Sequence, residues 1–228
     1  MMRNALLCCL LSFYIQAYAE TDPYNRVGFQ VEAAREVAND LLAATMSVEV
    51  QEKQPTGVAQ HINTVINAAL KNASAFKTIK ARSGNQNTRP VYGKNNQVDA
   101  WRGHAEIILE SRDFKAVSDL VVQLQQNMQL VNMNFSVSPD TQALIENELI
   151  LEAIKKFETR ADVIRTALGA SSYKNVSLSI NNGGGMPMPQ PKSLMRGAMA
   201  MEAAIPTPEF AAGDTRLVIH VSGIIELQ

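Results

Sequence analysis

The sequence has few of the side chains that most often carry chemistry. Its 228 residues include two cysteines, Cys8 and Cys9, one tryptophan and three histidines. The histidines, His61, His104 and His220, form no His-x-x-x-His or Glu-x-x-His pair, whereas a zinc site usually needs three or four nitrogen or sulfur ligands at recognisable spacing. We therefore predict no metal site among them and interpret each as a surface or sheet histidine.

Neither sign of charge is in excess. The chain has 21 lysines and arginines against 22 aspartates and glutamates, a formal net charge of −1. Proteins that bind nucleic acid or an anionic membrane surface usually carry a basic face or a run of cations, and no such footprint is visible here. We expect no nucleic-acid partner.

Long hydrophobic runs are also missing, apart from a short one near the start. Residues 1–19 have one cation, Arg3, an apolar run over residues 5–15, and small residues at Ala17 and Ala19. The run is shorter than the ~20 residues that a membrane-spanning helix needs, and the arrangement is typical of a cleavable secretory signal. We expect an exported chain with no membrane span. Because both cysteines lie in the signal, the exported chain would have no thiol.

Catalytic motifs are missing too. No Gly-x-Ser-x-Gly elbow marks a nucleophilic serine. The run Gly183–Gly185 leads into prolines, so it lacks the helix N-terminus of a phosphate-binding loop. The sequence predicts no catalytic or cofactor-binding residue and no cofactor, and we expect a protein that is not an enzyme. A hydrolase that uses His104 or His220 stays as an alternative.

What is present is a regular succession of strand and helix patterns. Apolar residues alternate at a two-residue period over residues 27–31 and 42–50, as in strands with one buried face. A helical period follows over residues 55–69. The order strand, helix, strand returns over residues 101–138, so two such units follow one another.

Between the two units, residues 76–97 predict a strand that runs into a polar turn. Gly84, Pro90 and Gly93 punctuate this segment. Glycine and proline are the residues that most strongly interrupt regular structure. We therefore expect the strand to end within this segment.

The strongest local pattern is one long helix. It begins with Ser138 as N-cap and Pro139 at the first helical position, and it ends at Gly169. An apolar stripe follows it at steps of three and four residues: Ile150, Ile154, Phe157, Ala161, Ile164 and Leu168. The pattern predicts a helix that lies across a sheet, to which residues 173–180 and 215–227 add two strands.

The succession of these elements resembles a known family. "NFSVSPD" leads into the long helix that contains "EAIKKFETRADVIRTALG", and a "VSLSI" strand, a Met/Pro/Ala loop, "PTPEFAAGD" and a closing strand follow. From about residue 26 to residue 228 the chain is similar to the SIMPL-domain family of bacterial periplasmic proteins, which includes a periplasmic immunogenic protein and proteins associated with defence against oxidative stress. Gly28 matches the first glycine of a Gly-x-Gly strand of the family, whereas Gln30 departs from the second and Asn39-Asp40 departs from the family's Pro-Asp.

The resemblance implies an α+β fold. Its curved antiparallel sheet would be built from the two strand-helix-strand units, with one long helix and a C-terminal strand pair. The resemblance also implies a periplasmic location and a homo-oligomer of ring-like or channel-like form. We expect a single domain over residues 20–228, with two subdomains at about 24–97 and 98–228 as the alternative. The envelope partner, any ligand and the stoichiometry stay open.

A loop rich in methionine, proline and glycine is expected at residues 181–213. Five of the ten methionines lie in it: Met186, Met188, Met195, Met199 and Met201. Their thioether sulfurs suit Cu(I) and can be oxidised reversibly, which makes the loop a speculative soft-metal or oxidant-sensitive element. Methionine also adapts well to contact surfaces, and we favour a contact with another subunit.

These patterns together predict a function at the level of class. We expect a non-enzymatic exported SIMPL-domain protein that self-assembles in the periplasm, with a role in envelope or oxidative-stress tolerance. The alternative is a Cu(I)-binding or redox-buffering protein that acts through the methionine-rich loop.

Overall fold

The computed structural model describes residues 24–182 and 212–228. The expected signal peptide at residues 1–19 lies outside the described residues. So does most of the expected loop at residues 181–213, although its first two residues, Asn181 and Asn182, belong to a strand.

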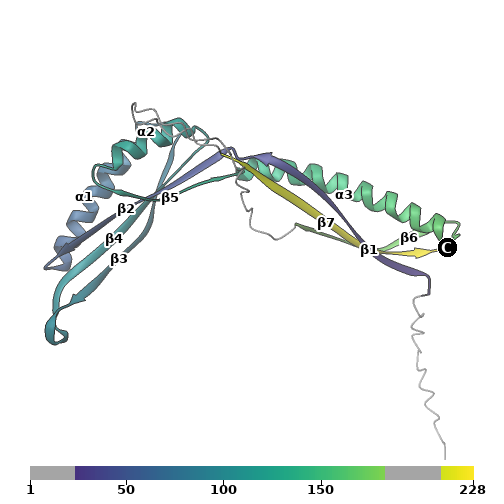
Figure 1. Cartoon of the computed structure of the whole chain (residues 1–228), viewed down its shortest axis with the longest axis horizontal. Coiled ribbons are helices and arrows are strands. Elements are labelled where there is room, and N and C mark those ends of the chain that lie inside the picture. Colours follow the sequence, from purple (N-terminus) through teal and green to yellow (C-terminus); the bar gives the residue numbers. More distant parts are fainter. Residues whose placement is uncertain (1–23, 183–211) are drawn as a thin grey trace, which may run out of the picture.

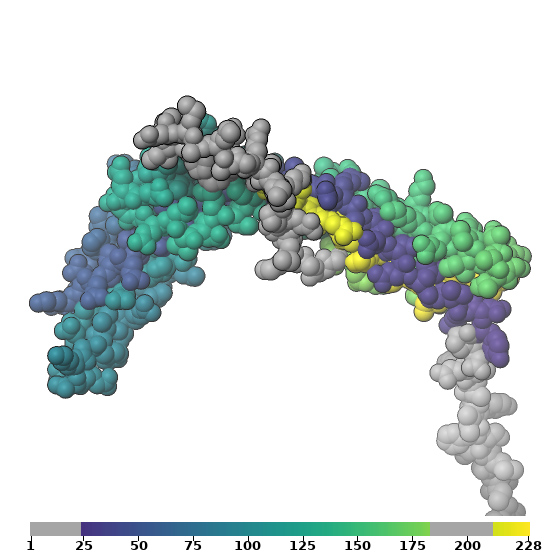
Figure 2. Space-filling model, viewed as in Figure 1, coloured from purple at the N-terminus to yellow at the C-terminus, as the bar shows by residue number. Residues whose placement is uncertain are grey.

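The described residues form two lobes that meet at an angle (Figure 1). We call residues 41–136 the four-stranded lobe, and residues 24–38, 139–182 and 212–228 the three-stranded lobe. The chain starts in the three-stranded lobe, builds the whole four-stranded lobe and then returns. In the space-filling view the lobes are the two arms of a bend (Figure 2).

The four-stranded lobe is an antiparallel sheet in the order β3-β4-β2-β5. Its elements are β2 (Leu41–Glu52), α1 (Pro55–Ala73), β3 (Lys80–Tyr92), the short 3-10 helix η1 (Lys94–Asn96), β4 (Val98–Ser111), α2 (Phe114–Leu124) and β5 (Gln129–Ser136). Alternate residues of β2 and β4 are buried against the apolar faces of α1 and α2. Gly103 on β4 lets α1 approach, because a Cβ there would lie 2.2 Å from Val58 Cγ1.

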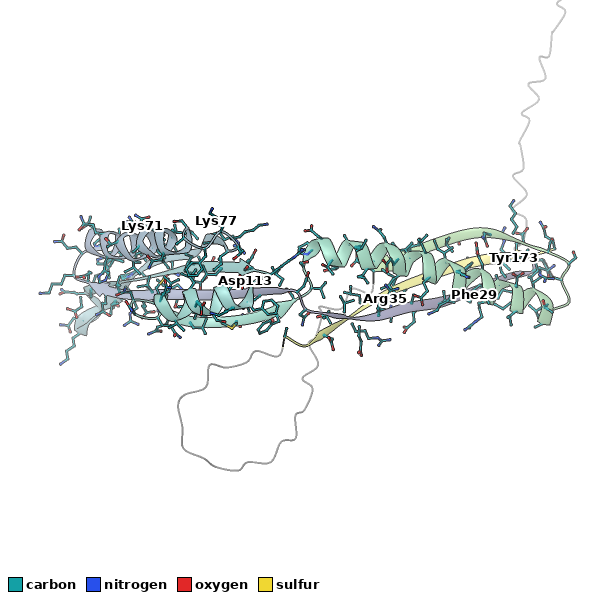
Figure 3. All side chains as sticks on the ribbon, turned by 90° about the horizontal axis from the view of Figure 1, so that it is seen from above. Phe29, Arg35, Lys71, Lys77, Asp113 and Tyr173 are labelled. Carbon is teal, nitrogen blue, oxygen red and sulfur yellow. The ribbon has the colours of Figure 1, made fainter. Side chains whose placement is uncertain are left out.

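The three-stranded lobe is an antiparallel sheet in the order β1-β7-β6. Its elements are β1 (Arg26–Ala38), α3 (Pro139–Ala167), β6 (Tyr173–Asn182) and β7 (Asp214–Leu227). The long helix α3 lies across this sheet, and the ring of Phe157 stacks on that of Phe29 with centroids 4.3 Å apart. Phe29 is visible beneath α3 in Figure 3. Gly223 on β7 lies under the same ring, and a Cβ added to it would lie 2.8 Å from Phe157 Cζ.

All three α-helices lie on the outer side of the bend (Figure 1). The sheet faces that carry no helix therefore look toward its inner side. Each lobe has its own cluster of buried apolar side chains. None of the helices that the structure describes is long and apolar enough to cross a membrane.

The α+β class and the antiparallel strands expected from the sequence are confirmed. The strands are divided between two unclosed sheets. The division suggested at residues 97 and 98 falls between η1 and β4, within the four-stranded lobe.

The strand β3 is longer than its sequence indicates. It continues through Gly84 and Pro90, and the turn begins only at Gly93. Proline is tolerated because β3 is an edge strand, where the missing N–H does not interrupt a second ladder. A bulge between Ser83 and Gln86 accommodates the glycine.

The buried stripe of α3 agrees with the expected one at Phe157 and Ala161 and differs from it at the other positions. Leu149, Ala153, Phe157 and Ala161 are buried, whereas Ile150, Ile154 and Ile164 are half-buried and Leu168 is 62% exposed. The small alanines let the helix backbone approach the sheet. Because the sheet has only three strands, the flanks of the helix extend beyond it.

Candidate functional site

The chain crosses between the lobes twice, and the first crossing consists of Asn39 and Asp40. Asn39 is 5% exposed, and its amide nitrogen donates to the carbonyl of Ala212 at 2.7 Å. The hydroxyl of Thr215 donates to Asn39 Oδ1, also at 2.7 Å. A buried amide needs such partners. Asn39 thereby fixes the end of β1 to the start of β7.

Asp40 connects the first crossing to the second, which runs from β5 into α3. Its Oδ1 accepts the backbone N–H of Ser138 at 2.6 Å. Its Oδ2 accepts the hydroxyls of Ser138 and Thr141, each at 2.8 Å. Ser138 is the N-cap of α3 as expected, but its hydroxyl oxygen accepts no backbone N–H of the helix, and the hydroxyl donates to Asp40. A carboxylate beside a helix N-terminus is stabilised by the helix dipole.

The pKa of the Asp40 carboxyl is lowered from its ordinary value. Burial is the largest single influence and raises the pKa, but the lowering contributions together outweigh it. They are the backbone N–H of Ser138, the hydroxyls of Thr141 and Ser138, and the nearby guanidinium of Arg112. Asp40 is therefore a stable carboxylate and not a poised acid or base.

Arg112 brings the four-stranded lobe to the same point. Its Nη2 donates to Ser138 Oγ at 2.7 Å, and its Nε lies 3.5 Å from Asp40 Oδ2. The same Nη2 lies 3.4 Å from the carboxylate of Asp140. We call Asp40, Arg112, Ser138, Asp140 and Thr141 the junction cluster. Its hydroxyls bond the half-buried carboxylate of Asp40, so the cluster holds the lobes in place and offers no free nucleophile.

A pocket of about 650 Å³ lies beside the junction cluster. It is lined by Leu41, Thr78, Lys80, Glu110, Ser111, Arg112, Asp113, Ser138, Pro139 and Asp140. Several of its polar groups serve the fold: Asp113 Oδ1 accepts the N–H of Ala116 and caps α2, and Ser111 Oγ donates to Thr78 O. Asp113 lies at the junction end of the four-stranded lobe in Figure 3. Acids and bases are mixed in this lining, so its charge selects no ligand class.

The three histidines lie apart, as their spacing suggests. His61 on α1 is 3.7 Å from Glu52, and His104 on β4 is 3.1 Å from Glu106. His220 on β7, in the other lobe, is 3.0 Å from the side-chain nitrogen of Gln30. Within residues 24–182 and 212–228, no group of three or more His, Cys, Asp or Glu is placed to hold a metal ion.

The five methionines singled out in the sequence lie outside the described residues. Met186, Met188, Met195, Met199 and Met201 are therefore not placed by the structure. The copper and oxidant interpretations stay predictions.

Both sheets of the described residues have two edge strands each. The three-stranded sheet ends in β1 and β6, and the four-stranded sheet ends in β3 and β5. Edge strands present backbone N–H and C=O groups that can pair with another strand. Along β6 every residue after Tyr173 is exposed, and Val176, Leu178 and Ile180 are 40%, 43% and 40% exposed.

Sequence patterns missed both the junction cluster and the free edge of β6. Asn39-Asp40 stood out only as a departure from the Pro-Asp of the family. Arg112 and Thr141 had no local signal, because their partner Asp40 is far away in the chain. The strand at β6 was expected, but its position at an edge depends on which strands pair.

The fold and these features define a class: a two-lobed α+β protein with unclosed antiparallel sheets and, within the described residues, no compact catalytic cluster. The SIMPL family model, described as "Protein of unknown function (DUF541)", matches residues 27–225. The chain therefore belongs to the SIMPL family. No curated protein matches it.

Proposed function

We propose that this SIMPL-family protein is a non-enzymatic scaffold that is exported to the periplasm and self-assembles there, with a role in envelope or oxidative-stress tolerance. The observation that carries the proposal is the pair of unclosed sheets, above all the exposed edge strand β6. An exposed strand edge with apolar side chains favours pairing with another chain. The signal-like residues 1–19 support export.

Light scattering of residues 20–228 tests the assembly part of the proposal. We expect a mass well above that of one chain at micromolar concentration. A variant in which residues 183–206 are replaced by a short Gly/Ser linker separates two sources of assembly. If the variant keeps the mass of the native protein, the described lobes carry the contact; if it becomes a folded monomer, the methionine-rich segment carries it. A native protein that is a monomer contradicts the proposal.

Cell fractionation tests the proposed periplasmic location. The full chain should be recovered in the periplasmic fraction, and a chain that lacks residues 2–19 should stay in the cytoplasm. Recovery of both chains in the same fraction contradicts export by this segment. The biological role is tested by comparing peroxide and detergent sensitivity of cells with and without the gene.

A second candidate function is Cu(I) binding or redox buffering through the five methionines. It rests on their clustering in the sequence and on the affinity of thioethers for Cu(I). Titration with Cu(I) in the presence of a competing chelator should show binding to the native protein. This binding should disappear when all five methionines are replaced by leucine. Binding that is unchanged in the leucine variant rules out this segment.

A further inference from the structure

Among the four edge strands of the described residues, β5 and β6 carry the least charge: β5 has no charged residue and β6 has one. Natural edge strands are usually guarded by charges, prolines or bulges, or by being short. The strand β3 carries Lys80, Arg82, Arg89 and Pro90. The strand β1 carries two arginines and two glutamates, and β5 has only eight residues. In contrast, β6 has ten residues, no proline and a single charge, Lys174, and its one bulge lies between Asn175 and Ser177, near its start.

The sequence of β6 is also symmetric about its centre. Read outward from Leu178, the chain meets serine on both sides, then Val176 and Ile180, then asparagine on both sides: Asn175-Val176-Ser177-Leu178-Ser179-Ile180-Asn181. An antiparallel pair of identical strands related by a twofold axis places each residue opposite its counterpart across the centre. Here that arrangement matches apolar with apolar and serine with serine.

The apolar residues of this segment face the helix. Leu178 pairs with Gly223 and Ile180 pairs with Val221 on β7, and both of these positions lie under α3. Directly opposed residues of an antiparallel pair point to the same face. Leu178 and Ile180 therefore lie on the α3 side of the sheet, at its free edge. A bulge between Asn175 and Ser177 leaves Val176 without a partner on β7, so the regular part of the strand is residues 177–182. About an axis at Leu178, the pairs formed wholly by regular residues are Leu178 with Leu178 and Ser177 with Ser179.

The side of α3 that lies above β6 is apolar as well. Asn182 on β6 donates to the carboxylate of Glu146 at 3.1 Å, which fixes this side of the helix. Ile150 and Ile154 follow Glu146 at steps of four residues, so they lie on the same side. Both are half-buried against the core of this lobe. Together with Leu178 and Ile180 they form an apolar strip that the three-stranded sheet does not cover.

From these observations we propose that β6 pairs with β6 of a second copy of this chain, antiparallel, about a twofold axis at Leu178. The inference rests on the self-assembly in the proposed function and names its surface. The two three-stranded sheets become one sheet of six strands, with both α3 helices on the same face. Residues 175–182 carry no charge, so the twofold axis brings no like charges together.

Cysteine cross-linking tests the position of the axis. The chain from residue 20 onward has no cysteine. With Leu178→Cys, the two thiols lie opposite each other, and mild oxidation should produce a covalent dimer that dithiothreitol reverses. Lys174→Cys is the matched control on the same strand. Its two thiols would lie about 25 Å apart at 3.3 Å per residue, so it should stay uncross-linked. Equal cross-linking of both variants, or none of Leu178→Cys, overturns the proposal.

A charge test uses the other face of the strand and so spares the core. The double substitution Ser177→Lys, Ser179→Lys places lysine opposite lysine across the proposed axis. We expect the dissociation constant of the dimer contact to rise about tenfold. Asn85→Lys, Asn87→Lys adds the same two charges to the edge strand β3 and should leave that constant unchanged. Far-UV circular dichroism and the urea midpoint establish that each variant is folded.

The outcomes separate this inference from the proposed function. If the native protein is a monomer, both the assembly and the β6 pairing fail. If the native protein is an oligomer, lysines on β6 leave its mass unchanged and lysines on β3 reduce its mass, then self-assembly stands and the β6 pairing is overturned. Loss of association with lysines on β6 alone supports both.

Discussion

The two lobes follow the same plan but complete it to different degrees. Each packs helices on one face of an antiparallel sheet. The core cluster of the four-stranded lobe has 18 buried residues, and that of the three-stranded lobe has ten. The smaller lobe leaves its edge residues Val176, Leu178 and Ile180 about 40% exposed. Among the described residues, nine of the large apolar side chains that are exposed lie in the three-stranded lobe and five in the four-stranded lobe. The comparison teaches that the lobe with the smaller core leaves more of its apolar side chains at the surface.

Removing the central aromatic of the smaller lobe should have the largest effect. Phe157 is fully buried and stacks on Phe29. We expect Phe157→Ala to lower the free energy of unfolding by about 3–5 kcal/mol. Trp101, the single tryptophan, packs against the core of the four-stranded lobe. Its fluorescence therefore reports on that lobe, whereas far-UV circular dichroism reports on both.

In urea, Phe157→Ala should move the midpoint seen by circular dichroism more than the midpoint seen by Trp101 fluorescence. Leu109→Ala, in the four-stranded lobe, is the reciprocal control and should move the fluorescence midpoint strongly. Identical shifts by both probes would mean that the lobes unfold as one unit. The two lobes would then have no separate free energies of unfolding to compare.

The two glycines beneath the helices sharpen the comparison. A Cβ on Gly223 would lie 2.6 Å from the backbone oxygen of Ser177 and 2.8 Å from the Phe157 ring. Because a backbone atom and a stacked ring cannot rotate away, we expect Gly223→Ala to cost about 2–3 kcal/mol. At Gly103 the obstacles are the side-chain ends of Val58 and Ile62, so Gly103→Ala should cost about 1–2 kcal/mol. Urea unfolding measures both, and the reverse order would show that α1 is packed more rigidly than α3.

Asp40 tests how the lobes are held together. Asp40→Asn turns an amide nitrogen toward donors, and we expect a loss of about 1–2 kcal/mol at about pH 7. Because the folded pKa is lowered, the contribution of the carboxylate is present above the unfolded pKa of about 4 and is lost as the pH falls through the folded pKa. The stability difference between the native protein and the variant should therefore shrink in acid. A difference that grows on acidification would contradict this role.

The exposed ion pairs of the smaller lobe should matter least. Arg35 on β1 bonds Glu148 on α3 and lies 3.7 Å from Glu152. Exposed pairs of this kind contribute little, because water and salt screen them. We expect Arg35→Gln to leave the urea midpoint unchanged within error. A clear shift would mean that this pair, and not the apolar core, holds α3 on the sheet.

Local patterns in the sequence identify the elements well and their assembly poorly. The long helix from Pro139 to its stop at Gly169 was predicted because Pro, Gly and apolar spacing act locally. The edge position of β6 depends on pairing with β7, more than thirty residues away in the chain at their nearest ends, and no local signal encodes it. The same holds for Asp40 and Thr141, which are 101 positions apart. The strand β3 was underestimated because an edge tolerates the residues that interrupt a central strand.

Leu41, the first residue of the four-stranded lobe, pairs with Ser136, its last residue. The two ends of the four-stranded lobe are therefore neighbours in space, and in the chain this lobe is inserted between β1 and α3 of the three-stranded lobe. Residues 41–136 thus form a continuous segment that begins and ends at one place in the fold. We expect a chain in which a short turn replaces this segment to keep β1 and α3 in one lobe, without the contacts that Arg112 makes to Ser138 and Asp140.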